Sequence, residues 1–407
     1  MHIFLNALGA TCASGFTYLR NVLPQFSAQA GVKVTVAVNR RFRDEVAGSA
    51  NISLCDCGAP EAAARRFLFE QAMLPGCIRR VGADVLISAG NFALRNSPVP
   101  QILLSGNSLY TCPEFRRDLR SREEYGLLTD HCVKSFFAKR SISWSDVTIA
   151  PSRTFGEELR TWTGKQIHAI YHGFDQNVFF GDGSPLPDEI KDKLDSARDS
   201  VRLLFVSHYN YYRNFETLLS AISILRTRPR KKVRLFLTCH LQAEDNPGSY
   251  RADRAATLVR KLGIQEEVVE LGSLPYSMLH RLYSACDIYV SPAYAESFAH
   301  PLVEAMACGM PVVASDLPVH QEICGRAARY FPRFSPEDLC ALLMQVANSS
   351  TLRRELSNEA KLRAQNFSWG NHVRDLIALA RELTQTRGVP RESTCPDRYD
   401  HSKLHAI

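Results

Sequence analysis

The chain has 407 residues, of which 45% are hydrophobic and 22% are charged. This composition is too apolar for a disordered protein and too polar for a membrane bundle, and the length allows two or three domains. Lys and Arg number 49 and Asp and Glu 42, which gives a net charge of +7 with His neutral. Such a mild excess is compatible with anionic substrates or a membrane surface, but it is too diffuse to argue for DNA.

The 12 cysteines contain no C-x-x-C pair and no His-rich zinc pattern. Several lie in apolar runs, such as Cys286 in SACDIYV and Cys308 in EAMACGMPVV, where a free thiol behaves as a small hydrophobic side chain. The opening MHIFLNALGA has no basic segment followed by a long apolar one, and no later stretch approaches the roughly 18 apolar residues of a membrane span. We therefore expect reduced thiols and a cytoplasmic protein.

Short apolar runs rich in β-branched residues alternate with helical patterns, which is typical of βαβ units. The strands predicted in the first half are HIFLN, VKVTVAV, ADVLISA, PQILLS, SDVTIA and QIHAIY. Those predicted in the second half are VRLLFVS, VRLFLTC, EVVELG, DIYVSP, PVVAS and ARYF. We therefore expect an α/β protein with two doubly wound, Rossmann-like parallel sheets that face each other across a cleft, with ligands at the carboxyl ends of the strands.

The polar stretch GDGSPLPDEIKDKLDSARDS, which follows Phe180, predicts a linker with one short helix. This places the domain boundary near residue 180. We predict a first domain over residues 1–178, a second over 179–368 and a last helix over 369–386 that can cross back to the first domain. Residues 387–407 have scattered charge and no periodicity, so a disordered tail is expected there.

The most informative segment is SPAYAESFAHPLVEAMACGMPVVASD, which begins at Ser291. A strand ends in a loop carrying Glu296, a helix is predicted from about Phe298 with Pro301 in its first turn, and Gly309 ends it. Glu304 follows Glu296 by eight residues, about two turns into this predicted helix. Unpaired backbone N–H groups at a helix start attract phosphate. An acidic pair beside such a start suits a nucleoside diphosphate sugar.

The Glu-x7-Glu arrangement, with ESFAHPLVEAMACGMPVVASD around it, resembles the donor-site signature of the retaining glycosyltransferases of family 4, which have a GT-B fold. Other segments are similar to family sequences in the same order: VRLLFVSHYNYYRNFETLLSAISIL, LGSLPYSMLHRLYSACDIYVSP, FSWGNHVRDL, the hinge-like IYHGFDQNVF and the turn ASGFTYLRNVLP. The resemblance extends over about residues 1–385.

The resemblance implies a role for each acidic residue. Glu304 would hold the ribose hydroxyls, Glu296 the donor hexose, and the amides of Ser297, Phe298, Ala299 and His300 the diphosphate. Further donor contacts are implied at Gly15, Ser207 and Gly272. A solvated helix face is the alternative for an acidic pair, but the flanking strand, Pro301 and Gly309 favour function.

The leaving diphosphate needs fixed cations where no metal is present. The family pattern offers Arg and Lys five residues apart, and the matching positions here are His208 and Arg213. Arg213 keeps the charge and can bind phosphate oxygens in a bidentate manner. His208 departs from the pattern, because an imidazole is only partly charged at neutral pH. An exposed loop residue is the alternative interpretation of His208, with Tyr209, Tyr211 and Tyr212 forming a lid or acceptor wall.

In the first domain, the turn from Gly9 to Gly15 lets the backbone approach a phosphate or an acceptor closely. It is neither G-x-G-x-x-G nor a Walker loop, so nicotinamide binding and ATP hydrolysis lose support. In the loop SGNSLY, where many relatives of the family place a His, this sequence has Asn107. Asn cannot act as a base, so it would orient the donor, or it would cap a helix or turn. An orienting role fits the family's retaining chemistry, in which the departing phosphate takes the acceptor proton.

No D-x-D is present, so no metal is predicted, and no cofactor is expected besides the nucleotide-sugar co-substrate. Basic residues cluster beside Phe67 and Phe69 and could rest the first domain on an anionic membrane with a lipid-linked acceptor. Solvated Arg side chains on amphipathic helices are the alternative. The cluster consists of Arg65, Arg66, Arg79, Arg80, Arg116, Arg117, Arg120 and Arg122.

The sequence thus predicts a two-domain, metal-independent glycosyltransferase that moves a hexose from a nucleoside diphosphate sugar to the hydroxyl of a saccharide or lipid-linked acceptor, with retention. Nucleic acid is not an expected partner. The loops after VRLFLTC and EVVELG are expected to frame the base. One rival is an epimerase or phosphorylase of the same fold. Another is a non-catalytic partner subunit that binds nucleotide sugar, although two partly buried carboxylates count against it.

Overall fold

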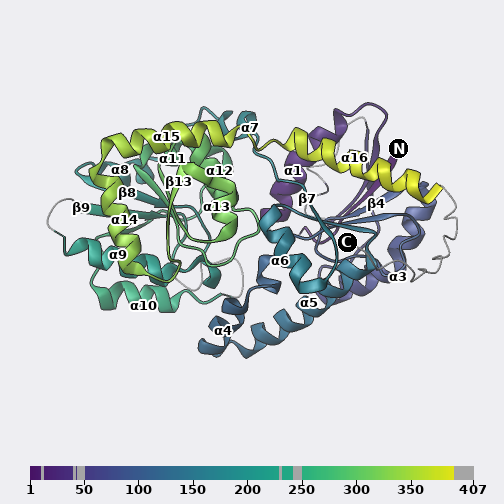
Figure 1. Cartoon of the computed structure of the whole chain (residues 1–407), viewed down its shortest axis with the longest axis horizontal. Coiled ribbons are helices and arrows are strands. Elements are labelled where there is room, and N and C mark those ends of the chain that lie inside the picture. Colours follow the sequence, from purple (N-terminus) through teal and green to yellow (C-terminus); the bar gives the residue numbers. More distant parts are fainter. Residues whose placement is uncertain (11–12, 40–42, 44–50, 229–231, 242–249, 389–407) are drawn as a thin grey trace, which may run out of the picture.

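The computed structural model describes residues 1–10, 13–39, 43, 51–228, 232–241 and 250–388. These residues form two α/β domains, as the sequence predicts (Figure 1). The predicted tail lies almost wholly outside the described residues, as does Cys12. Among the helices described, none combines the length and the apolar character needed to cross a membrane.

The first sheet has seven parallel strands in the order β3-β2-β1-β4-β5-β6-β7. They are β1 (His2–Ala7), β2 (Lys33–Val38), β3 (Ile52–Cys55), β4 (Val85–Ser88), β5 (Gln101–Leu104), β6 (Val147–Ala150) and β7 (Ile167–Ala169). The sequence predicted all of them except β3. That strand has an exposed Ser53 in its middle and no buried residue, so it lacks the continuous apolar run by which most of its neighbours are recognised.

The second sheet has six parallel strands in the order β10-β9-β8-β11-β12-β13. They are β8 (Ser200–Phe205), β9 (Lys232–Leu237), β10 (Val268–Glu270), β11 (Ile288–Ser291), β12 (Val312–Ser315) and β13 (Ala328–Phe331). The direction of winding reverses between β8 and β11, as it does between β1 and β4 in the first sheet. Ligands of doubly wound sheets bind beyond the carboxyl ends of such strands.

Helices cover both sheets (Figure 1). The first domain contains α1 (Ala13–Ser27), α3 (Ala63–Val81), η1 (Ser108–Tyr110), α4 (Pro113–Ser121), α5 (Tyr125–Trp144) and α6 (Arg153–Thr163). Then come α7 (Gln176–Phe180), α8 (Asp188–Asp195), η2 (Tyr211–Arg213), α9 (Phe215–Arg226), α10 (Asp253–Leu262), η4 (Tyr276–Met278) and α11 (Leu279–Ala285). The remaining helices are α12 (His300–Ala307), α13 (Pro318–Cys324), η5 (Gly325–Ala327), α14 (Pro336–Asn348), α15 (Ser350–Ala364) and α16 (Trp369–Gly388).

The stretch after Phe180 is more ordered than a polar linker. Its short helix is present as α8, but Leu186, Ile190 and Leu194 are buried in the core of the second domain. Ile190 and Leu194 are four residues apart and so share one face of α8, which packs inward while the charged residues face solvent. The polar composition of the segment made this apolar stripe hard to recognise in the sequence.

The last helix, α16, lies against α1 on the first domain (Figure 1). Its residues Trp369, Val373 and Leu376 are buried in the same core cluster as strand residues of the first sheet. The chain therefore passes between the domains twice, once near Gly173 and again near Trp369. A Cβ on Gly173 would lie 2.0 Å from the backbone nitrogen of Trp369, so only glycine lets the two crossings touch.

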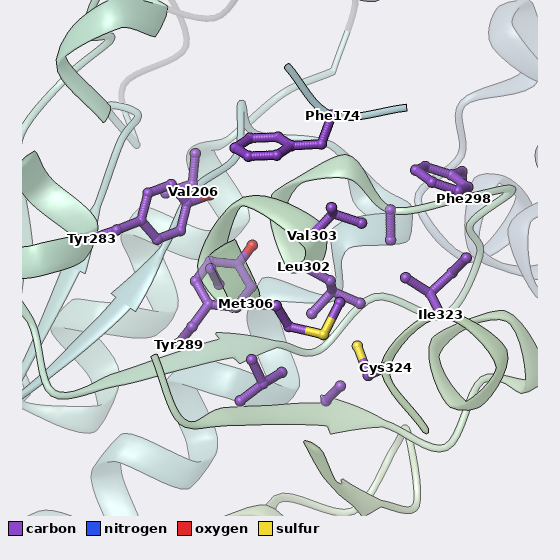
Figure 2. Packing of buried hydrophobic residues seen from close by; sticks show 14 of the residues in the cluster. Phe174, Val206, Tyr283, Tyr289, Phe298, Leu302, Val303, Met306, Ile323 and Cys324 are labelled. Carbon is purple, nitrogen blue, oxygen red and sulfur yellow. The ribbon is translucent and has the colours of Figure 1, made fainter. Parts of the chain in front are cut away.

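Helix α12 is the centre of the second-domain core. Leu302, Val303 and Met306 are buried on it. Figure 2 shows them in the middle of the cluster, with Tyr283 and Tyr289 on one side and residues such as Phe298 and Ile323 on the other. Close packing on this scale fixes the orientation of α12, and with it the direction of the polar side chains that the helix carries.

Candidate donor site

Glu304 is the most buried carboxylate of the candidate site. It lies on α12 and its residue is only 6% exposed. The hydroxyl of Tyr283 donates to its Oε2 at 2.9 Å, and the side chain of Tyr276 also forms a hydrogen bond with it. Burial raises the pKa of Glu304 to about 7, although the two tyrosines act in the opposite direction. The carboxylate is therefore held in a fixed orientation and keeps lone pairs for a further donor.

The sequence did not predict Tyr276 and Tyr283 as site residues. Both precede β11 in the segment YSMLHRLYSACD, within a stretch that resembles the family. Nothing in their spacing shows that α11 points one of them at α12. Only the hydrogen bond from Tyr283 to Glu304 in the folded protein reveals this.

The entrance to α12 differs slightly from the prediction. The helix begins at His300 rather than near Phe298, because Ala299 adopts a left-handed conformation with φ of 66° and serves as the N-cap. Glu304 is therefore about one turn into the helix rather than two. Pro301 is in the first turn, as predicted. A left-handed Ala costs about 1–2 kcal/mol, and such strain is common where backbone N–H groups are presented to a ligand.

Arg213 and Glu296 form an ion pair with each other. The sequence assigned them separate tasks at the diphosphate and the hexose, and the fold places both beside the carboxyl end of β11. The guanidinium also stacks over the ring of Tyr212, 5.1 Å from its centroid. Its Nε is buried and has no hydrogen-bond partner among the described residues. One donor of Arg213 thus stays available although the pair is formed.

Asn214 fixes the backbone that carries Arg213. It has a left-handed φ of 55° and is the N-cap residue of α9. Its Nδ2 donates to the carbonyl oxygens of Pro292 at 3.1 Å and Arg333 at 2.6 Å. These bonds tie the Arg213 loop to the ends of β11 and β13. An Asn at this position tolerates the left-handed conformation and also supplies the donor.

His208 is on the surface of the same loop. Desolvation and the nearby Arg213 cation lower the pKa of its imidazole. The ring is therefore mostly neutral at neutral pH, which leaves Arg213 as the fixed cation of the predicted pair. The preceding residue, Ser207, is buried. Its N–H donates to Thr238 Oγ1 at 3.0 Å and its hydroxyl to the carbonyl oxygen of His208 at 2.7 Å.

At two predicted glycine positions, a larger side chain would clash with neighbouring atoms. Gly15 is inside the first turn of α1 rather than in the preceding loop, and a Cβ there would come within 2.8 Å of Ala10 Cα. Gly272 has a left-handed φ, and a Cβ there would come within 2.6 Å of His240 Nε2. The loops after β9 and β10, which were predicted to frame the base, therefore meet at His240 and Gly272.

Asn107 has a structural role. Its Oδ1 accepts a hydrogen bond from the N–H of Leu109 at 3.1 Å and so caps η1. Its own N–H donates to Asn91 Oδ1 at 3.0 Å. The sequence left two roles open for Asn107, and the described contacts include the capping role.

The side chain of Phe298 belongs to the core, and that of His300 stacks on neighbouring aromatic rings and is partly exposed. Phe298 is 1% exposed. His300 stacks on His172 at 5.1 Å and on Trp369 at 6.0 Å between ring centroids. Burial lowers the pKa of His300 to about 4, so the ring is neutral. Phe298 can therefore contact a donor only through its backbone N–H, whereas the Nε2 of His300 has no hydrogen-bond partner among the described residues.

Ser297 connects the candidate site to the first domain. Its carbonyl oxygen accepts a hydrogen bond from Ser152 Oγ at 2.8 Å. Nearby, Glu322 of α13 accepts bonds from the N–H groups of Arg153 and Thr154 at the start of α6. Within the ranges that the structure describes, no group of three His, Cys, Asp or Glu side chains is arranged to hold a metal ion.

Comparison with known families finds a match over the second domain. The profile of the family described as glycosyl transferases group 1 matches residues 187–363. This match extends from the start of α8 to the end of α15 and contains every strand of the second sheet.

Curated relatives match a larger part of the chain at low identity. D-inositol 3-phosphate glycosyltransferase of Rhodococcus erythropolis is 26% identical over 282 residues, which are 63% of this chain and 62% of that protein. Serotype-specific mannosyltransferase WbdA of Escherichia coli is 24% identical over 261 residues, 62% of this chain and 31% of that protein. Mannosylfructose-phosphate synthase of Agrobacterium fabrum is 26% identical over 226 residues, 54% and 48% of the two chains. The matches span less than two thirds of each relative.

Solved structures match almost the whole chain. Sucrose-phosphate synthase from Thermosynechococcus elongatus superposes with a TM-score of 0.75 at 18% identity, covering 95% of this chain and all of that one (100%). Anabaena Alr3699/HepE in complex with UDP-glucose has a TM-score of 0.67 at 17% identity, with coverages of 94% and 100%. At these identities the likeness concerns the fold. The chain therefore has the GT-B fold, and the profile of the glycosyl transferases group 1 family matches its second domain.

Proposed function

We propose that the protein is a retaining, metal-independent glycosyltransferase. It moves a hexose from a nucleoside diphosphate sugar to the hydroxyl of a saccharide or lipid-linked acceptor in polysaccharide or glycolipid synthesis. The observation that carries the proposal is Glu304, a buried carboxylate kept in the core beside the start of α12. A carboxylate with a pKa raised by burial destabilises the folded protein, so a ligand-binding role explains its presence better than packing does.

The donor is expected to lie across the carboxyl ends of β8 and β11. Glu304 would accept hydrogen bonds from the two ribose hydroxyls, and the first N–H groups of α12 would bind the diphosphate. Arg213 would bind a phosphate oxygen through its unpaired Nε, while Glu296 would turn to the hexose hydroxyls. His240 and Gly272 lie where the base is expected. The Anabaena Alr3699/HepE structures in complex with UDP and UDP-glucose support this class of ligand.

The transfer would take place on one face of the sugar. The bond from the anomeric carbon to the phosphate oxygen breaks, and a bond to the acceptor oxygen forms on the same face. The acceptor proton passes to the departing phosphate, so no side-chain base is required. Arg213 and the N–H groups at the start of α12 would stabilise the charge that develops on the diphosphate. Neutral His208 would add one N–H donor, and Asn107 would keep the neighbouring first-domain loop in place.

A direct test is a thermal-shift panel of UDP, GDP, ADP and their hexose conjugates, with EDTA present throughout. We expect one nucleotide series to stabilise the wild type and to have little effect on Glu304→Ala. Stabilisation in EDTA would support a metal-independent donor site and name the base. No shift with any nucleotide would contradict the donor site and leave a non-catalytic partner subunit as the better interpretation.

Turnover assays separate the rivals. An epimerase would consume donor without an acceptor, and a phosphorylase would require inorganic phosphate. The neutral His208 and the capping role of Asn107 are the observations that favour a non-catalytic subunit. Such a subunit would bind nucleotide without hydrolysing it or transferring sugar to any acceptor in a screen. The proposed enzyme would release nucleoside diphosphate faster when its acceptor is present.

The proposal places the protein in the cytoplasm, with the first domain resting on an anionic membrane. The residues that the structure exposes for this membrane contact differ from those that the sequence predicted. Phe67 packs against Phe137, whereas Leu68 of α3 is 67% exposed and Phe136 of α5 is 56% exposed. Arg122 is buried in ion pairs and unavailable to lipid. Arg65, Arg79 and Arg80 remain exposed on α3.

Vesicle sedimentation tests the membrane contact. We expect wild-type protein to bind vesicles with 30% anionic lipid more than neutral vesicles, by about 1 kcal/mol per Arg near the surface. A Leu68→Ser, Phe136→Ser double variant should bind less. Leu362→Ser, an exposed apolar residue of α15 in the second domain, is the matched control. Equal binding by the two variants would contradict this surface.

A further inference from the structure

Helix α4 belongs to the first domain by sequence, but it packs into the second. Its residues Phe115 and Leu119 are buried in the core cluster of the second-domain helices α9 and α10. The ring of Phe115 meets Tyr212 edge to face at 6.4 Å and Tyr250 at 6.5 Å between centroids. Figure 1 shows α4 reaching away from the first sheet toward the second domain. The loop just before Arg213 is thus in contact with an element of the other domain.

Arg122, directly after α4, is the main polar link in this contact. It is only 7% exposed. Its Nε donates to Asp118 Oδ1 at 2.6 Å within the first domain, and its Nη2 donates to Glu216 Oε1 at 2.7 Å in the second. The guanidinium also stacks over the ring of Tyr211, 4.1 Å from its centroid. The planar guanidinium group of Arg can make all three contacts together, whereas the ammonium group of Lys cannot.

These contacts lie on both sides of Arg213 in the chain. Tyr211 precedes it by two residues and Glu216 follows it by three, in the first turn of α9. Tyr211 makes a second contact with the first domain, because its hydroxyl donates to Glu124 Oε1 at 2.8 Å. The short η2 turn that carries Arg213 is therefore fastened at both ends by residues of the first domain.

Further bonds connect the same parts. Tyr294, which follows β11, donates from its hydroxyl to Asp118 Oδ2 at 2.8 Å. Asp118 is therefore shared by Arg122 and by a loop of the candidate site. At the other end of α4, Arg116 Nη2 donates to the carbonyl oxygen of Tyr110, in the η1 turn capped by Asn107. A continuous set of contacts thus runs from the Asn107 loop through α4 to Arg213.

We propose that Arg122 is a positioning residue for the donor diphosphate, holding the Arg213 loop in its binding geometry from the opposite domain. This inference rests on the proposed function, because it gives Arg213 a diphosphate to bind. Arg122 itself touches no donor. Its removal should leave the Glu304 side of the site intact and impair only contacts made through Arg213.

Nucleotide affinities separate positioning from simple interface stability. The variant is Arg122→Met, which keeps an unbranched chain but removes the fork. The control is Arg117→Met, on α4 itself, where the Arg is exposed and, among the described residues, pairs only with Glu114. The probes are the mono- and diphosphates of whichever base the thermal-shift panel selects. We expect Arg122→Met to weaken the diphosphate about tenfold, roughly the loss of one charge-assisted contact, and the monophosphate less than twofold.

The outcomes are distinguishable. Equal weakening of both nucleotides, or none, would overturn the positioning role and leave Arg122 as an interface residue. Arg122→Lys should recover little of the loss, since it cannot bond Asp118 and Glu216 while stacking on Tyr211. If Arg122→Met does not fold, Tyr294→Phe removes the hydroxyl that fixes Asp118, and a smaller loss of the same selectivity is expected. A wild type that binds neither nucleotide would overturn the proposed function, and this inference with it.

A readout without ligand completes the test. Hydrogen exchange of the backbone amides in residues 208–216 should be faster in Arg122→Met than in Arg117→Met or the wild type. Unchanged exchange in this segment would contradict the claim that Arg122 holds the loop, whatever the affinities show.

Discussion

The two domains use buried polar side chains in different ways. In the first domain the buried amides serve the fold: Gln101 accepts from the N–H of Leu94 at 2.7 Å and donates to its carbonyl oxygen at 3.0 Å, and Asn107 caps η1. In the second domain, Glu304 is buried at an energetic cost and Arg213 has an unpaired Nε. Groups left partly unsatisfied inside a protein are expected where a ligand completes them. Among the described residues, the first domain also has unpaired buried polar atoms, on Arg122, Ser141 and His172, and a buried carboxylate, Glu70, which accepts from Asn6. Arg213 differs from these because it pairs with Glu296 at the strand ends where the proposed donor would bind.

Removal of Arg213 should have the largest effect. We expect Arg213→Met to lower kcat by about a hundredfold to a thousandfold, because one preorganised charge on the leaving group is lost and Glu296 is left unpaired. Initial rates with saturating donor would measure it. Arg202→Met, which breaks the Arg202 and Asp287 pair near the opposite end of the sheet, is the control and should stay within twofold. A loss below fivefold in Arg213→Met would place the chemistry elsewhere.

The double variant Arg213→Met, Glu296→Gln separates two causes of that loss. If repulsion between an unpaired Glu296 and the diphosphate contributes, the second substitution should recover part of the nucleotide affinity but not kcat. Isothermal titration and rate measurements on the same preparations would show this.

Substitution of Glu304 should separate function from stability. The shift of the Glu304 pKa from 4.5 to about 7 makes ionisation unfavourable in the folded state by about 3 kcal/mol. The sign follows from the raised pKa: the contribution to stability is intact below pH 4.5 and is lost as pH rises through about 7. Glu304→Gln should therefore raise the Tm of the free protein at pH 8 and bind nucleotide tenfold to a hundredfold more weakly. A variant less stable at pH 8 would argue for a structural carboxylate.

The pH dependence of binding is a milder test of the same residue. Ribose hydroxyls bind the ionised carboxylate more strongly than the neutral acid, so nucleotide affinity should fall as pH decreases below about 7, by at most about tenfold per pH unit. Protonation of His208 would act in the opposite direction, because it adds a cation near the diphosphate. Titrations between pH 6 and 8 on wild type and Glu304→Gln would resolve the two, and a wild-type profile identical to that of the variant would exclude Glu304 as the titrating group.

Asn107 should show the smallest effect, and it tests the first-domain half of the comparison. Asn107→Asp keeps the oxygen that caps η1 and should hold kcat within about threefold, whereas Asn107→Ala should lose about 1 kcal/mol of stability. Thermal unfolding and initial rates on both variants would measure this. A hundredfold fall in kcat for Asn107→Asp at unchanged Tm would instead give the Asn107 amide a direct part in catalysis.

The sequence determined the fold class because the evidence for it is local. Alternating apolar strands and amphipathic helices appear in the order of residues, and only the four-residue β3 was missed. It also predicted Glu296 on the loop after β11 and Glu304 on the helix that follows, and the structure has both residues on these elements. The predicted start of that helix was wrong by two residues, since a left-handed Ala cannot be read from sequence.

Tertiary structure decided everything that depends on side-chain direction over long separations. No spacing shows that Arg213 pairs with Glu296, or that Tyr283 and Tyr276 hold Glu304. The basic residue Arg122 reads as a solvated helix charge, yet it is buried against Tyr211 and Glu216 of the other domain. The physical reason is that the periodicity of apolar residues determines only which face of a helix or strand is apolar. Which other element packs against that face is decided when the separate elements come together.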